Sequence, residues 1–179
     1  MTASPIAIAA LDPPTFAESL DRLAEILHAC VHEGASVGFV MPFGLDDARA
    51  YWRSKVEPSH QAGKRIVLAA RLGGTIAGTA QLDLDTMPNQ RHRGEASKVL
   101  VDPNLRRAGV ARALMLEIEA RAEAACRWLI TLDTAGDAAE ALYRSLGYRV
   151  AGAIPSYARD AFEDRYDATR LMYKDLRRG

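Results

Sequence analysis

The sequence predicts an α/β fold in which helices pack on one mixed sheet, and three features of its pattern support this. Two amphipathic helical segments come first, at residues 15–31 and from Asp46 toward Gln61. A β-hairpin follows around Gly73-Gly74, and strands then alternate with helices. Neither half of the 179 residues has its own complement of core segments. We therefore expect one domain over residues 1–179.

The charge balance excludes a general attraction to nucleic acid or to an anionic membrane. The chain has 23 basic and 23 acidic residues, so any anion site must be local. No apolar run is long enough to span a bilayer, and residues 1–10 lack the basic start and long apolar stretch of a signal peptide. We expect a cytoplasmic protein that binds neither nucleic acid nor membrane, as a monomer or homodimer.

The two cysteines give no sign of a metal site. Cys30 and Cys126 have no metal-ligand spacing and no neighbouring Cys or His cluster. We expect two reduced, buried thiols and no bound metal.

The first third of the chain has clear helix signals. Residues 6–8 are expected to form a short strand. Thr15 and Glu18 have capping-box spacing after two prolines, and apolar side chains recur at helical spacing to Val31. Glycines and Pro42 turn residues 34–44 into a loop. A second helix follows, and Pro58 weakens its end.

The rest of the chain supplies the sheet. Gly73-Gly74 separates strand-like residues 66–70 and 75–84, which is typical of a hairpin. A polar loop over residues 85–94 carries a basic cluster. The further elements expected are a strand at 95–101, an alanine- and leucine-rich helix at 109–125, a buried strand at 128–132, a helix at 138–145 that Gly147 stops, and strands at 148–153 and 169–173.

The strand at residues 95–101 leads into a segment suited to an anion. Arg106 and Arg107 precede a helix that opens at Gly109. Free N–H groups and the dipole at a helix start attract anions, and Gly109 and Ala111 let a diphosphate approach the backbone. No Gly-Lys-Ser/Thr follows, so this is not a P-loop. Taken alone, the pattern fits a helix start with solvated arginines equally well.

Two motifs together resemble the GNAT acetyltransferase superfamily. The first is Val99-x-Val101-x-Pro103 followed by R-x-x-G-x-A and a long helix, which is similar to the family's acetyl-CoA signature. The second is A-x-x-x-Y-x-x-x-G-Y, with Tyr143 and Gly147 at its fixed positions. They stand in the family's order with a strand-like segment between them. The resemblance covers residues 66–173, and more loosely the whole chain.

The resemblance implies a GNAT fold with acetyl-CoA as cofactor. That fold has a mixed, mostly antiparallel central sheet flanked by helices, with a splayed strand pair at the acetyl-CoA site. A backbone N–H, that of Leu100, is implied as the oxyanion donor. The residues implied to hold the cofactor are Val99, Leu100, Val101, Arg106, Arg107, Ala108, Gly109, Val110, Ala111 and Tyr143.

A closer resemblance is to tabtoxin-resistance-type acetyltransferases, which modify the amino group of a small β-lactam amino-acid toxin. It rests on three segments: His32-x-Gly34-Ala35-Ser36-Val37-Gly38-Phe39, then Glu95 ahead of Lys98-x-x-Val101, then Leu132-Asp133-Thr134-x-Gly136. Many GNAT members have Asn where Gly136 stands. A cofactor contact from that side chain is therefore absent here.

Two residues are candidates for the proton transfers. Glu95 is expected as the base that makes the amine neutral, and His92 or a water chain are the alternatives. By strand alternation, Glu95, Ser97, Val99 and Val101 should share a face. Resemblance places that strand beside the cofactor arm. The family position of Tyr143 implies that it protonates the departing thiolate.

The predicted function is acetyl-CoA-dependent N-acetyl transfer to a primary amine of a small molecule, by direct attack in a ternary complex. Acylation of a protein or peptide amine is an alternative, and so is a non-catalytic acyl-CoA-binding module. The presence of Glu95 and Tyr143 argues against the binding module. The acceptor-binding candidates are His32, Ser36, Phe39, Asp133 and Tyr157.

Overall fold

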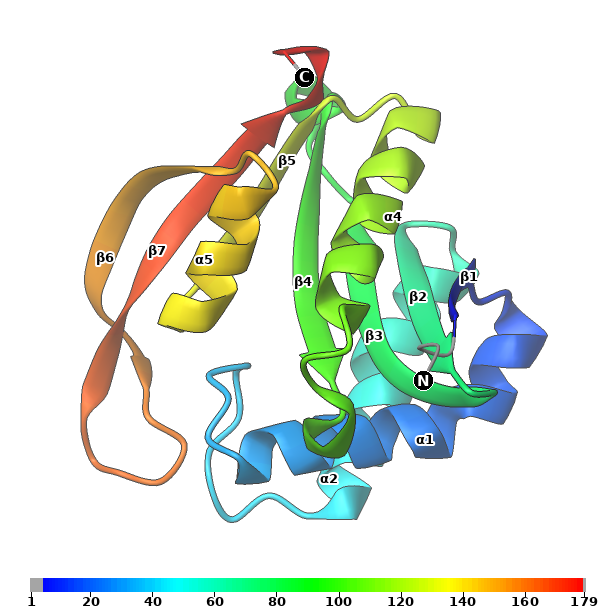
Figure 1. The fold of residues 1–179 in the computed structure, drawn as a ribbon, viewed down its shortest axis with the longest axis vertical. Coiled ribbons are helices and arrows are strands. Elements are labelled where there is room, and N and C mark those ends of the chain that lie inside the picture. The colour runs from blue at the N-terminus through cyan, green and yellow to red at the C-terminus, as the bar shows by residue number, and fades with distance from the viewer. Residues whose placement is uncertain (1–4, 179) are drawn as a thin grey trace.

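A computed structural model describes residues 5–178, in which seven strands join into one sheet with helices packed on it (Figure 1). Within that range no helix has the length and apolarity needed to cross a membrane. The elements in chain order are β1 (Ile6–Ala10), α1 (Pro13–His32), α2 (Leu45–Tyr51), the π-helical turn η1 (Trp52–Val56), α3 (Glu57–Gln61), β2 (Arg65–Leu72), β3 (Thr75–Asp83), the 3-10 turn η2 (Pro88–Gln90), β4 (Arg93–Val101), the 3-10 turn η3 (Pro103–Leu105), α4 (Val110–Ala124), β5 (Leu129–Thr134), α5 (Asp137–Ser145), β6 (Arg149–Arg159), β7 (Tyr166–Asp175) and the 3-10 turn η4 (Leu176–Arg178).

The strand order is β1-β2-β3-β4-β5-β7-β6. Neighbouring strands in the described part of the chain run antiparallel, except that β4 and β5 are parallel. A parallel pair needs a crossover, and α4 supplies it. The predicted fold class is confirmed: the sheet is mixed, mostly antiparallel and flanked by helices.

The centre of the sheet is buried on both faces. Alternate residues of β2 point to opposite sides, so Val67 and Ala69 pack with α1 while Leu68 and Ala70 pack with α4. The hairpin between β2 and β3 is confirmed, and Gly73 and Gly74 both have positive φ there, at 59° and 86°.

The start of α1 differs from the prediction. The N-cap is Asp12, whose carboxylate accepts from the Thr15 N–H at 2.9 Å, while the Thr15 hydroxyl accepts from the Asp12 N–H at 3.0 Å. The capping box is therefore one turn earlier than the predicted Thr15 and Glu18 pair. The reason is that prolines in the first turn need no N–H partner, so the helix begins at Pro13.

The predicted second helix is continuous but irregular. It consists of α2, the π-helical turn and α3. Pro58 has no N–H to donate to the carbonyl four residues earlier, and the turn before it is widened so that the Glu57 N–H donates to the Trp52 carbonyl. Trp52 is fully buried in this turn and packs in the core with α1.

The C-terminal strands are longer than predicted. β6 lies at the sheet edge and pairs with β7, and most of its residues are exposed. An exposed strand lacks the apolar alternation that reveals a buried one, so its second half was missed. The cysteine prediction is half wrong, because Cys30 is buried and Cys126 is exposed.

A close approach between α4 and the sheet sets the position of the helix start. A Cβ on Gly78 of β3 would lie 2.7 Å from the Leu100 carbonyl oxygen and 2.9 Å from Val110 Cγ1. Only glycine leaves this space, so the first turn of α4 lies directly against β3 and beside β4.

Candidate active site

The parallel strands β4 and β5 separate and leave a cleft between them. They pair over residues 93–95 and 129–131, and no further pairing is found along their described lengths. A cleft of about 780 Å³ lies beyond that point. Its walls are β4, β5, the starts of α4 and α5, residues 35–38, and parts of β6 and β7. The predicted splayed pair is therefore present.

The start of α4, at one end of the cleft, has an unusual backbone conformation. Gly109 has φ 85°, Arg107 has φ 66°, and no side chain caps the first turn of α4. Backbone turned in this way presents successive N–H groups on one side, and the helix dipole adds positive potential. Gly109, Val110 and Ala111 all line the cleft, so the first turn of α4 borders it.

Two arginines add charge at the same end. Arg106 and Arg107 are exposed and line the cleft, and within residues 5–178 neither forms an ion pair with a carboxylate. Arg106 also lies close to Cys30. Burial raises the pKa of the Cys30 thiol, and the Arg106 charge opposes that rise. The free backbone N–H groups and unpaired guanidinium groups fit a diphosphate such as that of coenzyme A.

A buried ion pair holds the segment before these arginines. The Asp102 carboxylate pairs with Arg22 of α1 and accepts from the Asn104 N–H at 2.9 Å. Burial acts to raise the pKa of Asp102, but the bonds from Arg22 and Asn104 outweigh it and lower the pKa. The Asp102 N–H also donates to the Ala77 carbonyl at 2.8 Å. The segment that leads to Arg106 is thus fixed to both α1 and β3.

A β-bulge in β4 changes which side chains share a face. Ser97 pairs with Gln81 and Leu100 pairs with Thr79, so two residues of β4 lie opposite one residue of β3. Lys98 sits in this bulge with φ 49°. Leu100 packs on the α1 side, whereas Val99 and Val101 pack on the α4 side.

The prediction that Glu95, Ser97, Val99 and Val101 share a face is therefore wrong. Register puts Glu95 and Ser97 on the face of Leu100, opposite Val99 and Val101. The extra residue in the bulge reverses the alternation, and nothing in the local sequence signals that extra residue.

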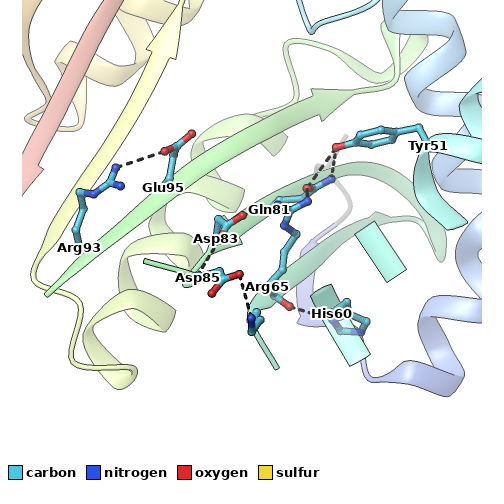
Figure 2. Close-up of polar contacts among 9 residues, drawn as sticks. Tyr51, His60, Arg65, Gln81, Asp83, Asp85, Arg93 and Glu95 are labelled. Carbon is cyan, nitrogen blue, oxygen red and sulfur yellow. Dashed lines mark hydrogen bonds and ion pairs between the residues drawn. The ribbon is translucent and has the colours of Figure 1, made fainter. Parts of the chain in front are cut away.

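Glu95 lies beside the cleft rather than in its wall. Its carboxylate pairs with Arg93 at 3.4 Å, and 51% of its side chain is exposed. Figure 2 shows this pair next to a polar row in which Arg65 pairs with Asp83 and also donates to Gln81. Glu95 is not among the residues that line the cleft, although its charge acts on Lys98, which does line it.

His92, the alternative base, is stacked on Trp128 with ring centroids 4.4 Å apart. It is not among the residues that line the cleft. The structure therefore places both predicted bases outside the wall.

Tyr143 of α5 reaches the cleft. Its side chain lines the wall although only 7% of the residue is exposed, and its hydroxyl makes no hydrogen bond in the described part of the chain. Burial, together with the negative charge of Asp133, raises the pKa of Tyr143 to about 12. The hydroxyl is therefore a protonated donor at neutral pH that has no hydrogen-bond partner among residues 5–178.

The structure brings most of the other predicted residues together. Every predicted cofactor residue lines the cleft except Ala108. Of the acceptor candidates, Ser36, Asp133 and Tyr157 line it. His32 lies outside the wall, with Nε2 2.9 Å from the Phe43 carbonyl oxygen. Phe39 also lies outside, packed on Phe43 and Tyr51.

Sequence reasoning missed Lys98 as a site residue. It lines the cleft from the bulge in β4. Its place in Lys98-x-x-Val101 was visible, but a bulge depends on pairing with a distant strand. No local signal could have shown that the side chain reaches the cleft.

Comparisons with known proteins agree with this fold. The model of the acetyltransferase (GNAT) family matches residues 20–148. An uncharacterized N-acetyltransferase in the hisH-hisA intergenic region of Azospirillum brasilense is 30% identical over 116 residues, which are 64% of this chain and 67% of that protein. The chain belongs to the acetyltransferase (GNAT) family.

Two solved structures show how widely the fold is shared. A ribosomal-protein-alanine N-acetyltransferase from Brucella melitensis is 25% identical, with a TM-score of 0.78 over 95% of this chain and 99% of that one. A phosphinothricin acetyltransferase from Sinorhizobium meliloti, in complex with AcCoA, is 20% identical, with a TM-score of 0.78 over 98% of this chain and 89% of that one. Acetyl-CoA is the acetyl donor in this family.

Proposed function

We propose that the protein transfers an acetyl group from acetyl-CoA to a primary amine of a small molecule, by direct attack in a ternary complex. The observation that carries this is the cleft itself. It joins an anion cradle at the start of α4 to the unpartnered hydroxyl of Tyr143, between strands that have separated. Acetyl-CoA supplies an activated thioester carbonyl, and the protein supplies binding, orientation and proton transfer.

The cofactor role falls to the residues around the first turn of α4. Arg106, Arg107 and the N–H groups of residues 108–111 would hold the pyrophosphate. Val99 to Val101 would lie along the pantetheine arm, with the Leu100 N–H as the oxyanion donor. The unpaired state of both arginines supports this assignment, because no carboxylate of the described chain competes for them.

Glu95 is proposed as the proton acceptor, acting through water. The position of its carboxylate beside the wall, and not in it, favours a water relay over direct contact. Asp133 lies in the wall and would attract the ammonium form of the acceptor before it loses its proton.

Tyr143 is proposed as the donor to the departing sulfur. A pKa of about 12 lies above that of a thiol, about 8.5 for cysteine, so a thiolate would not fully deprotonate this tyrosine. The hydroxyl would thus stabilise the thiolate by a hydrogen bond: coenzyme A leaves as its thiolate, and the proton lost by the amine passes through water to Glu95. This refines the expected role from a proton donor to a hydrogen-bond donor.

The acceptor class is proposed as a toxin, an antibiotic or an amino-acid-like metabolite of the cytoplasm, as the tabtoxin-resistance-type resemblance implies. Ser36 and Tyr157 line the cleft and are the proposed acceptor contacts. A protein acceptor is the second candidate, favoured by the Brucella relative whose name gives ribosomal-protein alanine as its target.

A thiol-release assay with acetyl-CoA tests these alternatives. The amines would be amino acids, polyamines, aminoglycosides and a peptide with an N-terminal alanine. We expect release with small amines. Release with the peptide alone would support the protein acceptor. No release in a protein whose melting temperature still rises with acetyl-CoA would overturn catalysis and support a binding module.

A further inference from the structure

Lys98 carries a cation that has no ion-pair or hydrogen-bond partner among the residues that the structure describes. Its ammonium lies 5.9 Å from the centre of the Phe39 ring and 5.8 Å from that of Tyr51. Gly38 also lies near this ammonium, because a Cβ built on Gly38 would be 3.8 Å from Lys98 Nζ. The side chain is half-buried and lines the cleft.

The charges of Asp133 and Glu95 favour the protonated form of Lys98, but neither carboxylate forms an ion pair with it. Across residues 5–178, Lys98 Nζ has no carboxylate oxygen within 4 Å and makes no hydrogen bond. Other lysines do have such partners: Lys174 pairs with Glu119 at 2.7 Å and Lys64 with Asp85 at 3.2 Å. Burial lowers the pKa of Lys98, which shows that its surroundings disfavour the charge.

Packing alone does not account for such a residue. Burial costs the ammonium part of its hydration free energy. Cation–π contacts with the two rings offset part of that cost, since one such contact contributes about 0.5–2 kcal/mol. An apolar residue of similar length would fill the same space without that cost. The left-handed backbone of Lys98 adds strain, and strain of this kind is concentrated at ligand sites.

A negative group faces the same cleft. Asp133 lines the wall, and its charge favours the protonated form of Lys98, yet the two form no ion pair. The Asp133 charge also acts on Tyr143, the proposed donor to the leaving sulfur. The cleft wall therefore holds a positive group and a negative group that do not form an ion pair with each other. A molecule with both an ammonium and a carboxylate is complementary to that arrangement.

We propose that Lys98 binds a carboxylate of the acceptor, so that the acceptor is an amino acid or a derivative that keeps its free carboxylate. Lys98 would be a specificity-determining residue, and Asp133 would direct the amine toward the thioester. The inference rests on the proposed acetyl transfer and narrows its substrate class. The anion of the cofactor is a different one, because the cradle at Gly109 with Arg106 and Arg107 serves it.

The test compares amino acids with the amines that they give on decarboxylation, such as phenylalanine with phenethylamine and tyrosine with tyramine. The readout is the ratio of kcat/KM for the carboxylate-bearing member to that for the amine without that group. We expect Lys98→Met to lower this ratio by about tenfold or more, the value of a lost charged hydrogen bond. Lys98→Arg should restore part of it.

Lys64→Met is the matched control, because Lys64 pairs with Asp85 on the surface and does not line the cleft. The ratio should stay as in the wild type. The melting temperature of Lys98→Met should equal or exceed that of the wild type, since a half-buried unpaired charge is removed. Lys98→Gln serves in its place if Lys98→Met does not fold.

Three results would overturn the inference while leaving acetyl transfer intact. They are a wild type that prefers the decarboxylated amines, an unchanged ratio in the folded variant, and a loss of coenzyme A affinity on calorimetry of Lys98→Met. If no amine is acetylated, the proposed function fails instead. The inference is then tested by calorimetry with coenzyme A present, comparing N-acetylphenylalanine with N-acetylphenethylamine: equal binding would overturn it, and preference for the former that Lys98→Met removes would support it.

Discussion

The Arg22 guanidinium on α1 pairs with the Asp102 carboxylate at the end of β4, which is 80 positions further along the chain. The same guanidinium donates from Nε to the Ile76 carbonyl at 3.1 Å. The N-terminal helix is thereby tied to the segment that carries Arg106 toward the cleft. This contact gives α1 a part in positioning the proposed anion cradle.

Asp102→Asn should weaken both stability and cofactor binding. Loss of a charged, largely buried hydrogen bond costs about 2 kcal/mol, and the freed segment should also lower the affinity for acetyl-CoA. Urea unfolding and calorimetry measure the two effects. Asp46→Asn is the control, because that side chain is 95% exposed in its pair with Arg49 and should change neither.

The same pair predicts a pH dependence. The pKa of Asp102 is lower in the folded protein than in the unfolded chain. Its ion pair therefore stabilises the fold fully at pH values above the ordinary aspartate pKa, and this stabilisation is lost as the pH falls through the pKa of the folded state. Stability of the wild type should therefore fall in acid more steeply than that of Asp102→Asn. Parallel acid curves for the two proteins would show that the pair contributes nothing.

Gly109→Glu should abolish the rise in melting temperature that acetyl-CoA causes. It puts bulk and a negative charge at the anion cradle and strains a backbone with φ 85°. Gly63→Glu is matched for strain, because Gly63 has φ 68° with nothing within 4 Å, and it lies away from the cleft. The control should keep the ligand-induced rise. Equal loss in both variants would mean that strain, and not the cradle, is responsible.

How much of the fold the sequence predicts depends on whether its signals are local. The helix at 109–125 and the hairpin at Gly73-Gly74 were predicted correctly, because apolar periodicity and paired glycines act over a few residues. The bulge at Lys98 was not, since it arises from register against β3. The second half of β6 was missed because its exposed residues carry no apolar pattern.

The candidate site shows the same division. The motif at Arg106–Ala111 and the position of Tyr143 lie along continuous segments, so residues of both reach the cleft as expected. The neighbours of Glu95 depend on which face of the sheet it occupies. The extra residue in the bulge of β4 puts Val99 and Val101 on the opposite face from Glu95. Lys98 and Asp133 come from separate strands, so their shared cleft is a property of the tertiary structure.

Tyr143→Phe should lower kcat by about tenfold to a hundredfold while leaving acetyl-CoA affinity nearly unchanged. The variant removes one hydrogen bond to the leaving sulfur and keeps the ring that packs near Tyr148. Steady-state rates and calorimetry separate the two effects. Tyr166→Phe is the control, because Tyr166 is 62% exposed and does not line the cleft. An unchanged kcat in Tyr143→Phe would remove this role.

Tyr143 should also affect stability in alkali. Its pKa is about 12 in the fold, against the ordinary value of 10.0, so the unfolded chain loses this proton first. Stability should therefore fall as pH rises from about 10 toward about 12. Tyr143→Phe should show a shallower fall over that window in urea unfolding. An identical slope would mean that the hydroxyl is more solvated than its burial implies.

Glu95→Gln and Asp133→Asn should change different kinetic parameters. If Glu95 takes the proton through water, Glu95→Gln should lower kcat by about a hundredfold at neutral pH. The deficit should shrink as pH rises, because the acceptor amine then arrives already neutral. Asp133 lies in the wall and would attract the charged amine, so Asp133→Asn should mainly raise the acceptor KM.

Glu117→Gln is the control for both, since Glu117 pairs with Arg121 along α4 and lies outside the cleft. The decisive comparison is which variant shows the kcat loss that alkali rescues. Rescue in Asp133→Asn and not in Glu95→Gln would assign the base to Asp133. That outcome has a physical basis, because the Asp133 carboxylate borders the cleft while the carboxylate of Glu95 is held by Arg93 beside it.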